Sequence, residues 1–442
     1  MTMRFILALV CAAAFDATAG RAQVAPPDSV QMADTTSLGA LQDSAVSRDP
    51  RARELALLAA QSRLRLANIR AESKPTVAVE GQAQYQSDVA RIPITLPGGI
   101  KVPTPPHDTY DAHVAVGQQL YDPALRLRRA VEESQLAEQE AQLRAQLYPL
   151  RQNVNDAYFA ALRAQSQVAE LQLGITDLEA QLQVATSRVN HGTALPSEEK
   201  SLRAEILRRR QSLADARASR NASLVVLSDL TGQRFDSLTI LATPELGARL
   251  ATVRDSIDSI TARPEFEQFA RSRALLEQQE RAQNAQVLPR VSLFGRAGYG
   301  RPGLNPLSDK FDSYWLAGVQ LQWTPWNWGT TSREKEVLAL QRQIVTAEEQ
   351  SFRDNLRRGT VQDLATIDRL VAALAEDDEI VALRESIAAE TRARFREGVV
   401  TSAEYVDRQT DVVSARTSRA LHRVELAQAR AHLLNTLGIE TR

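Results

Sequence analysis

Apolar and polar residues alternate with a period of two in four short segments of the chain. These segments are residues 76–86, 111–121, 290–300 and 313–323. Such alternation predicts strands with one apolar face and one polar face. Their length, about 9–11 residues, is also that of a strand that crosses a bilayer at the tilt of a barrel. Taken alone, the pattern fits a membrane barrel and a soluble antiparallel sheet with one wet face equally well.

Outside these segments the apolar residues recur three and four positions apart, which predicts helices. Two stretches are unusually long, about 125–189 and about 332–397. The first contains only Pro149 and Gly174 as helix breakers, and the second has none before Gly359. At 1.5 Å per residue, a helix of about sixty residues is a rod of about 90 Å. Small residues and glutamines on the seams predict coiled-coil-like packing against neighbouring helices.

The same order of elements occurs twice along the chain: strands, a long helix, a tight turn and a returning helix. The turns lie at about 189–196 and 396–402. A duplicated unit of this kind predicts an assembled tube, because neither copy could bury its apolar stripes alone. The chain therefore divides into two repeats, 37–235 and 262–442, joined by a connector (236–261). A signal peptide (1–22) and a disordered leader (23–36) precede them.

The first residues indicate export from the cytoplasm. A positive charge at Arg4, an apolar run from Phe5 to Phe15 and small residues up to Ala22 are typical of a cleaved signal peptide. Cys11, the only cysteine, lies in that run and follows Val10, which is too large for the usual lipid-attachment site. The mature chain is thus expected to have no disulfide and no thiol nucleophile.

Neither charge nor motif predicts a catalytic site. With 53 Lys and Arg against 54 Asp and Glu, the near-zero net charge argues against a nucleic-acid binder. Gly298, Gly300 and Gly303 match a dinucleotide-binding fingerprint by letter, but a proline-containing loop follows them instead of a helix. The histidines have no ligand spacing; they are His107, His113, His191, His422 and His432. We predict no enzyme, no cofactor and no metal site.

The two turns are better candidates for function. Each has the form R-x-x-x-G, at Arg188 and Gly192 in the first turn and at Arg394 and Gly398 in the second. Glycine there fits a helix that enters the left-handed region before it reverses. Structurally these segments are the tips of helical hairpins. Functionally, tips so far from a membrane would form a docking surface for another protein.

Several segments together resemble the TolC family of outer-membrane efflux proteins, also called outer membrane factors. They include QLYDP after the second strand, ARPEFEQ at 262–268, VLPRVSLFGRAGYG at 287–300, the two R-x-x-x-G turns, and LLNTLGIE at 433–440. The resemblance implies a mainly α chain with four strands, three copies of which form a twelve-stranded membrane β-barrel and a helical tunnel across the periplasm. It also implies a homotrimer in outer-membrane lipid, a periplasmic adaptor at the tips, and an inner-membrane pump.

The resemblance further implies a gate at the periplasmic end. Acidic residues just past the second tip ring that end in the family, and Glu404 and Asp407 occupy those positions here. A trimer would gather six carboxylates, which attract cations and could hold a divalent ion. One departure is Glu404, where a shorter Asp is familiar. The alternative is that both acids merely satisfy the dipole of the helix that they begin.

Three functions of different classes fit this sequence. The first is an outer-membrane exit duct for small molecules such as drugs, metals or other toxic compounds, delivered by a pump and an adaptor. The second is the exit duct of a type I protein-secretion system, which has the same architecture. The third is a structural coiled-coil protein of the envelope. The segments that carry the family resemblance favour the first.

Overall fold

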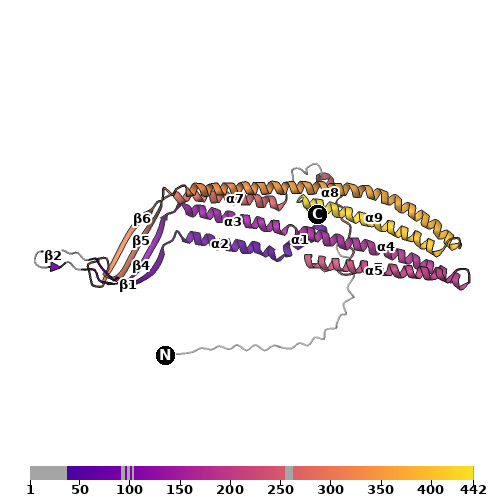
Figure 1. Ribbon diagram of the computed structural model, residues 1–442, viewed down its shortest axis with the longest axis horizontal. Coiled ribbons are helices and arrows are strands. Elements are labelled where there is room, and N and C mark those ends of the chain that lie inside the picture. Colours follow the sequence, from indigo (N-terminus) through magenta and orange to yellow (C-terminus); the bar gives the residue numbers. More distant parts are fainter. Residues whose placement is uncertain (1–36, 91–94, 97–99, 102–103, 254–261, 442) are drawn as a thin grey trace, which may run out of the picture.

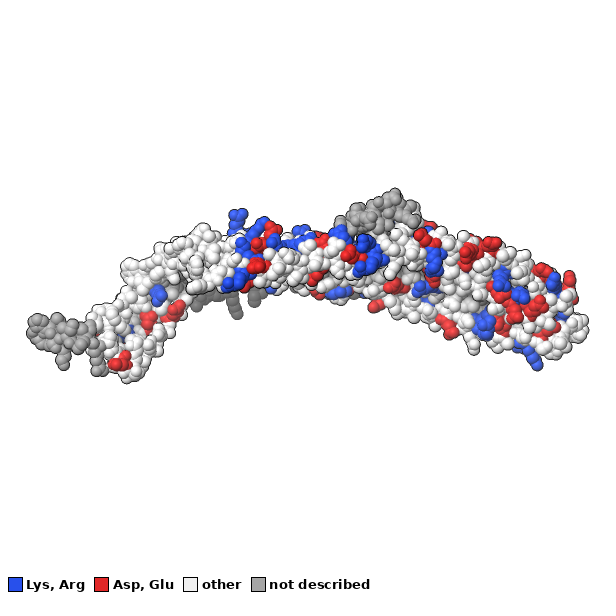
Figure 2. Space-filling view, turned by 45° about the horizontal axis from the view of Figure 1, so that its top comes forward, with Lys and Arg blue, Asp and Glu red and all other residues white. Residues whose placement is uncertain are grey.

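The computed structural model describes residues 37–90, 95–96, 100–101, 104–253 and 262–441. The expected signal peptide and leader, residues 1–36, and part of the expected connector lie outside this set. The molecule is elongated, with a β-sheet at one end and two helical hairpin tips at the other (Figure 1). Charged side chains gather over the helices, whereas the sheet end carries few of them (Figure 2).

Four antiparallel strands form the sheet in the order β1-β4-β5-β6. They are β1 (Thr76–Tyr85), β4 (Asp108–Tyr121), β5 (Arg290–Arg301) and β6 (Asp312–Gln322). All four lie within three residues of the segments that the alternation predicts. A small hairpin of β2 (Thr95–Leu96) and β3 (Ile100–Lys101) lies between β1 and β4. Distant parts of the sequence thus pair because both repeats contribute two strands to one sheet.

The two faces of the sheet differ sharply in polarity. One cross-strand row joins Val79, Val114, Ala297 and Trp315, and the next joins Glu80, His113, Gly298 and Tyr314. On the apolar face, Val79 is 83% exposed and Trp315 is 76% exposed in the single chain. A soluble sheet would turn this face toward its core. Here it faces outward, as a surface in contact with lipid would.

Long helices run from the sheet to the tips (Figure 1). On the sheet side they are α2 (Glu54–Ala71), α3 (Pro123–Leu147) and α7 (Pro264–Asn284). On the tip side they are α4 (Leu150–Asn190), α5 (Pro196–Thr231) and α9 (Ser402–Thr436). The 67-residue α8 (Thr330–Arg396) runs the whole distance, and Gly359 does not interrupt it. No helix in the described part of the chain has an apolar stretch long enough to cross a membrane.

The expectation of one unbroken helix over 125–189 is wrong. The chain forms α3 and α4, separated at Tyr148 and Pro149. Proline has no N–H to donate, and its ring clashes with the preceding turn of a helix. The hydroxyl of Tyr148 donates a 2.7 Å hydrogen bond to the carbonyl of Asn435, near the end of α9. Gly174, by contrast, lies inside α4 without breaking it.

The main core lies at mid-length, where helices from both repeats meet. Two short helices contribute to it, α1 (Leu38–Arg48) and α6 (Gly247–Val253), and α1 packs on α4. Two 3-10 helices lie outside this core: η1 (Pro50–Arg53) connects α1 to α2, and η3 (Ala285–Val287) connects α7 to β5. Leu41, Phe159 and Leu434 are almost completely buried there. Burial raises the pKa of the Tyr158 hydroxyl to about 12, although it donates a hydrogen bond to the carbonyl of Ala242. This packed middle fixes the hairpins that carry the tips.

Candidate functional site: the hairpin tips

Both hairpin tips have the same backbone. Gly192 and Gly398 lie in the left-handed region, with φ of 71° and 77°. The amide of the next residue donates a 2.9 Å hydrogen bond to the carbonyl of Arg188 in one tip and of Arg394 in the other. The glycine amide itself bonds to the carbonyl three residues back, which completes a Schellman motif. In each tip the returning helix begins four residues after the glycine.

The side chain of Arg188 joins the two tips. Its Nη1 donates a 2.8 Å hydrogen bond to the carbonyl of Phe395, and its guanidinium lies over the Phe395 ring, 5.6 Å from the centroid. A Cβ atom placed on Gly398 would come within 2.8 Å of Nη2 of the same side chain. Gly398 therefore provides both the turn and the space for Arg188. This side chain therefore links the first tip to the second.

Arg394, at the equivalent place in the second tip, does not reach across. Its Nη2 lies 2.5 Å from Oε1 of Glu390, one turn back on α8, and both side chains are mostly exposed. Gly192 likewise has no atom near the position of a Cβ. Of the four predicted tip residues, Arg188 therefore makes an internal contact. Gly192, Arg394 and Gly398 are exposed.

Beneath the tips, a network that the sequence did not reveal connects α4, α8 and α9. The carboxylate of Asp177 accepts a 2.7 Å hydrogen bond from the Tyr405 hydroxyl and a 2.5 Å bond from Arg392. The Tyr405 ring stacks on Phe395, with the centroids 5.1 Å apart. Burial, and then the hydrogen bond to the charged Asp177, raise the pKa of the Tyr405 hydroxyl. The tips thus rest on an ordered polar and aromatic layer.

A buried arginine lies one layer further from the tips. The Arg209 side chain is 5% exposed, and its Nε donates a 2.8 Å hydrogen bond to Glu205, one turn back on α5. Its Nη2 reaches Thr410 on α9 at 3.2 Å. A Cβ atom on Gly174 would meet the Nη1 atom at 2.5 Å, so this helical glycine makes room for the guanidinium. Gly174, an isolated helix-interior glycine, was the only sequence signal for the site.

The acids of the expected gate both lie on the exposed side of α9, near its start. The Thr401 hydroxyl caps this helix by accepting a 3.3 Å hydrogen bond from the amide of Glu404. Glu404 therefore occupies a position where an acid also satisfies the helix dipole. Asp407 borders an open groove between α5 and α9, next to Arg208. One chain places the two carboxylates one turn apart but does not itself form a ring.

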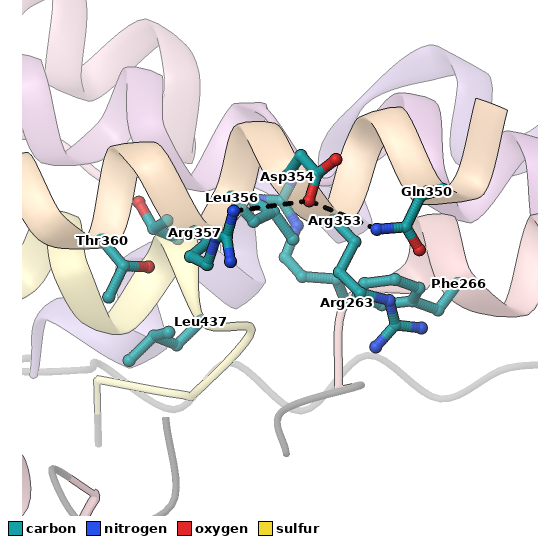
Figure 3. A pocket seen from close by; sticks show the side chains of 10 residues that line it. Arg263, Phe266, Gln350, Arg353, Asp354, Leu356, Arg357, Thr360 and Leu437 are labelled. Atoms are coloured by element: carbon teal, nitrogen blue, oxygen red, sulfur yellow. Dashed lines mark hydrogen bonds and ion pairs between the residues drawn. The ribbon is translucent and has the colours of Figure 1, made fainter. Parts of the chain in front are cut away.

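A second hollow, far from the tips, lies beside α7, α8 and the end of α9 (Figure 3). Arg263, Arg353 and Arg357 line it. Each is already near a carboxylate: Arg263 pairs with Glu265, Arg353 lies 3.0 Å from Glu349, and Arg357 lies 3.9 Å from Asp354. Each of these three guanidinium groups therefore already has an acidic partner. Within the described residues, no group of three or more His, Cys, Asp or Glu could enclose a metal ion.

Comparison with known proteins gives one family and several similar folds. Residues 43–233 match the family model described as outer membrane efflux protein. No curated protein matches the chain. The structure is similar to the outer membrane protein VceC of Vibrio cholerae, with 14% identity, a TM-score of 0.65, and coverage of 92% of this chain and 97% of that one.

Two further solved structures are similar to the chain. One is the outer membrane channel MtrE of Neisseria gonorrhoeae in its open state, with 17% identity, a TM-score of 0.63, and coverage of 92% of this chain and 89% of that one. The other is CusC, with 15% identity, a TM-score of 0.67, and coverage of 92% and 93%. At such identities the likeness shows the fold, and it extends over both repeats.

Proposed function

Because residues 43–233 match the outer membrane efflux protein family, we propose that the chain is the passive exit duct of a tripartite efflux system. The predictions of the family, of the fold class and of an outer-membrane location are confirmed. A duct moves its cargo without a reaction, which agrees with the absence of a catalytic motif in the sequence. The cargo that we propose is small molecules, delivered by an inner-membrane pump and a periplasmic adaptor.

One observation supports a pore more than any other: a four-stranded sheet with an exposed apolar face on one side and polar residues on the other. Within the described sheet, the outer edges of β1 and β6 have no partner strand. Unpaired strand edges are costly in lipid, so a spanning sheet must close. A barrel wide enough to conduct needs about eight strands or more. Three chains would give twelve and would remove every edge.

The docking surface that we propose is formed by the exposed parts of both tips. Gly192, Arg394 and Gly398 face solvent in the single chain. Arg188 supports this surface from within by fixing the distance between the tips. A periplasmic adaptor would therefore meet two turns of the same backbone shape, held side by side.

Glu404 and Asp407 are proposed as the cation-attracting ring at the periplasmic end of the duct. Both are exposed, as side chains directed toward an axis between chains would be in one chain alone. Glu404→Ala with Asp407→Ala should reduce the preference for cations and the block by divalent ions in planar-bilayer recordings. Glu198→Ala is the matched control, because Glu198 follows Gly192 at the same distance as Glu404 follows Gly398. Equal effects of the two variants would make Glu404 a helix-capping acid.

The duct itself is tested by the assembly and conductance of the full-length protein. Extracted from outer membranes in detergent, it should have the mass of three chains and should form water-filled channels in planar bilayers. A protein of monomer mass, or a trimer that never conducts, would contradict the proposal. Passage of a polypeptide instead of small solutes would point to a secretion duct of the same architecture.

A further inference from the structure

The polar face of the sheet contains a cluster that the duct proposal does not use. Glu80, His113, Gly298 and Tyr314 form one cross-strand row, and Asp111 lies two residues before His113 on the same face of β4. A Cβ atom on Gly298 would lie 2.5 Å from Cβ of His113. The missing side chain therefore gives the imidazole its space beside β5.

Hydrogen bonds fix the orientation of the His113 ring. Its Nδ1 lies 2.6 Å from Oδ2 of Asp111, and the hydroxyl of Tyr314 donates a 2.5 Å hydrogen bond to Oδ1 of the same carboxylate. A carboxylate can only accept, so Nδ1 carries a hydrogen and donates it to Asp111. In the neutral ring, Nε2 then has the free electron pair.

That Nε2 atom points at a second carboxylate. The His113 side chain is 8% exposed, and Nε2 is buried without a hydrogen-bond partner in the described part of the chain. Oε2 of Glu80 lies 3.3 Å away, on a side chain that is 61% exposed and so free to adjust. Two electron-rich atoms that face each other repel unless a cation lies between them. The nearby charges include Arg296 on the same face of β5, opposite Ala115 and Leu316.

We propose that His113 and Glu80 bind a divalent metal ion of the zinc type on the polar face of the sheet. At usual Zn–N and Zn–O distances, a separation of 3.3 Å corresponds to an N–Zn–O angle of about 105°, close to tetrahedral. Asp111, itself held by Tyr314, orients the imidazole as carboxylates behind metal-binding histidines do. Two protein ligands leave the remaining positions to water, so the ion exchanges readily.

The location of this site gives it a role that rests on the proposed duct. If three chains close a barrel, the polar face lines the pore, and three copies of the site lie at one level of it. A cation that passes through the outer membrane would then meet a ring of weak binding sites. Zinc bound there would in turn narrow the pore and reduce its conductance.

The test is a zinc titration of the full-length protein in detergent, by calorimetry. All proteins carry Glu404→Ala and Asp407→Ala, so that the acids near the tips do not contribute. The expected result is one zinc ion per chain. Glu80→Gln, an exposed and nearly isosteric change, should weaken binding at least about tenfold, and Asp111→Asn by about 10–100-fold, the usual cost of losing such a carboxylate. His113→Gln should abolish it.

His107→Gln is the matched control, because His107 is at the same end of the molecule but stacks on Tyr85 and bonds to the carbonyl of Gln86. It should bind zinc as tightly as the parent, the protein that carries only Glu404→Ala and Asp407→Ala. Absence of saturable zinc binding in the parent would overturn the site and leave a shared proton as the only cation between His113 and Glu80. Binding that survives Glu80→Gln and His113→Gln unchanged would also overturn it.

These outcomes are separate from those of the duct proposal. A parent protein that conducts but does not bind zinc would remove the site and leave the duct. A protein that binds one zinc per chain but never conducts would remove the duct and leave the site.

Discussion

The two tips share one backbone but differ in the side chains that surround it. Counted from the glycine, Phe395 and Tyr405 of the second tip correspond to Val189 and Glu199 of the first. The second tip therefore has an aromatic stack beneath it. The first tip instead supplies Arg188, which bonds to the carbonyl of Phe395. The duplicated turns are therefore complementary: the first supplies the Arg188 side chain, and the second supplies the stacked aromatic residues that it contacts.

The turn and its side-chain contacts are therefore separable. Both glycines satisfy the same hydrogen bonds, so the turn needs only a residue that tolerates positive φ. Only Gly398 also needs to lack a side chain, because Arg188 occupies the adjacent space. Identical substitutions in the two tips should therefore have unequal effects.

The largest difference in local stability is expected between Gly398→Ala and Gly192→Ala. Each change adds about 1 kcal/mol of backbone strain at positive φ. Gly398→Ala also displaces Arg188 from Phe395, and a hydrogen bond from a charged group contributes about 1.5 kcal/mol or more. We expect about 2–3 kcal/mol of local destabilisation in the second tip and about 1 kcal/mol in the first. Hydrogen–deuterium exchange of the tip amides in the full-length protein would measure both.

The sheet serves as the internal control in that experiment, since its exchange should not change in either variant. Equal loss of protection in the two tips would mean that the Arg188 contact contributes nothing to tip stability.

The next effect is expected from the arginines themselves. Arg188→Met should cost about 1–2 kcal/mol at the tips, because it removes the bond to Phe395 and the contact with its ring. Arg394→Met should cost at most about 0.5 kcal/mol, since an exposed ion pair contributes little. Exchange of the Gly398 and Val399 amides measures the difference. A larger effect of Arg394→Met than of Arg188→Met would contradict the conclusion that Arg188 is the arginine that joins the two tips.

Tyr405→Phe is expected to cost about 1 kcal/mol, because Asp177 keeps its bond to Arg392. This effect depends on pH. The pKa of Tyr405 is raised in the folded protein, so above about pH 10 the unfolded chain loses a proton that the folded chain keeps. The stabilisation is complete below about pH 10 and is lost as pH rises through the folded pKa. Thermal unfolding by circular dichroism at about pH 8 and about pH 11, on either side of the unfolded pKa, should show the difference between wild type and variant shrinking.

A difference between wild type and Tyr405→Phe that stays constant over this range would show that the hydroxyl is not protected by Asp177. Other tyrosines titrate in both proteins, so only the difference between the two curves is informative.

The sequence predicts those parts of the fold that depend only on neighbouring residues, namely the strands and the turns. The change of period at Thr76 and Trp315 located strands because alternation depends only on neighbouring residues. The turns were located because a left-handed residue at a helix end favours glycine. Pro149 was seen in the sequence, but its effect was underestimated: the chain divides into α3 and α4 there.

The contacts of the site could not be predicted because they join distant residues. Asp177 meets Tyr405, 228 positions away, and Arg188 meets Phe395, 207 positions away. Nothing in the local sequence distinguishes such an aspartate or arginine from the many exposed ones. The cluster around the buried His113 is similar, since Glu80 comes from β1 and Tyr314, which donates to Asp111, comes from β6. Repeats show which segments correspond, but not which side chains cross between them.

The shared Schellman turn has a consequence for stoichiometry. A trimer of this chain would present six turns of one backbone shape, but only three of each chemical kind. A partner that recognises the carbonyls and the bend of the turn could bind all six places, and its ring would then have sixfold character around a threefold tube. A partner that recognises the Arg394 side chain would find three places and match the tube subunit for subunit. Counting bound partners per trimer would therefore reveal whether backbone or side chain is recognised.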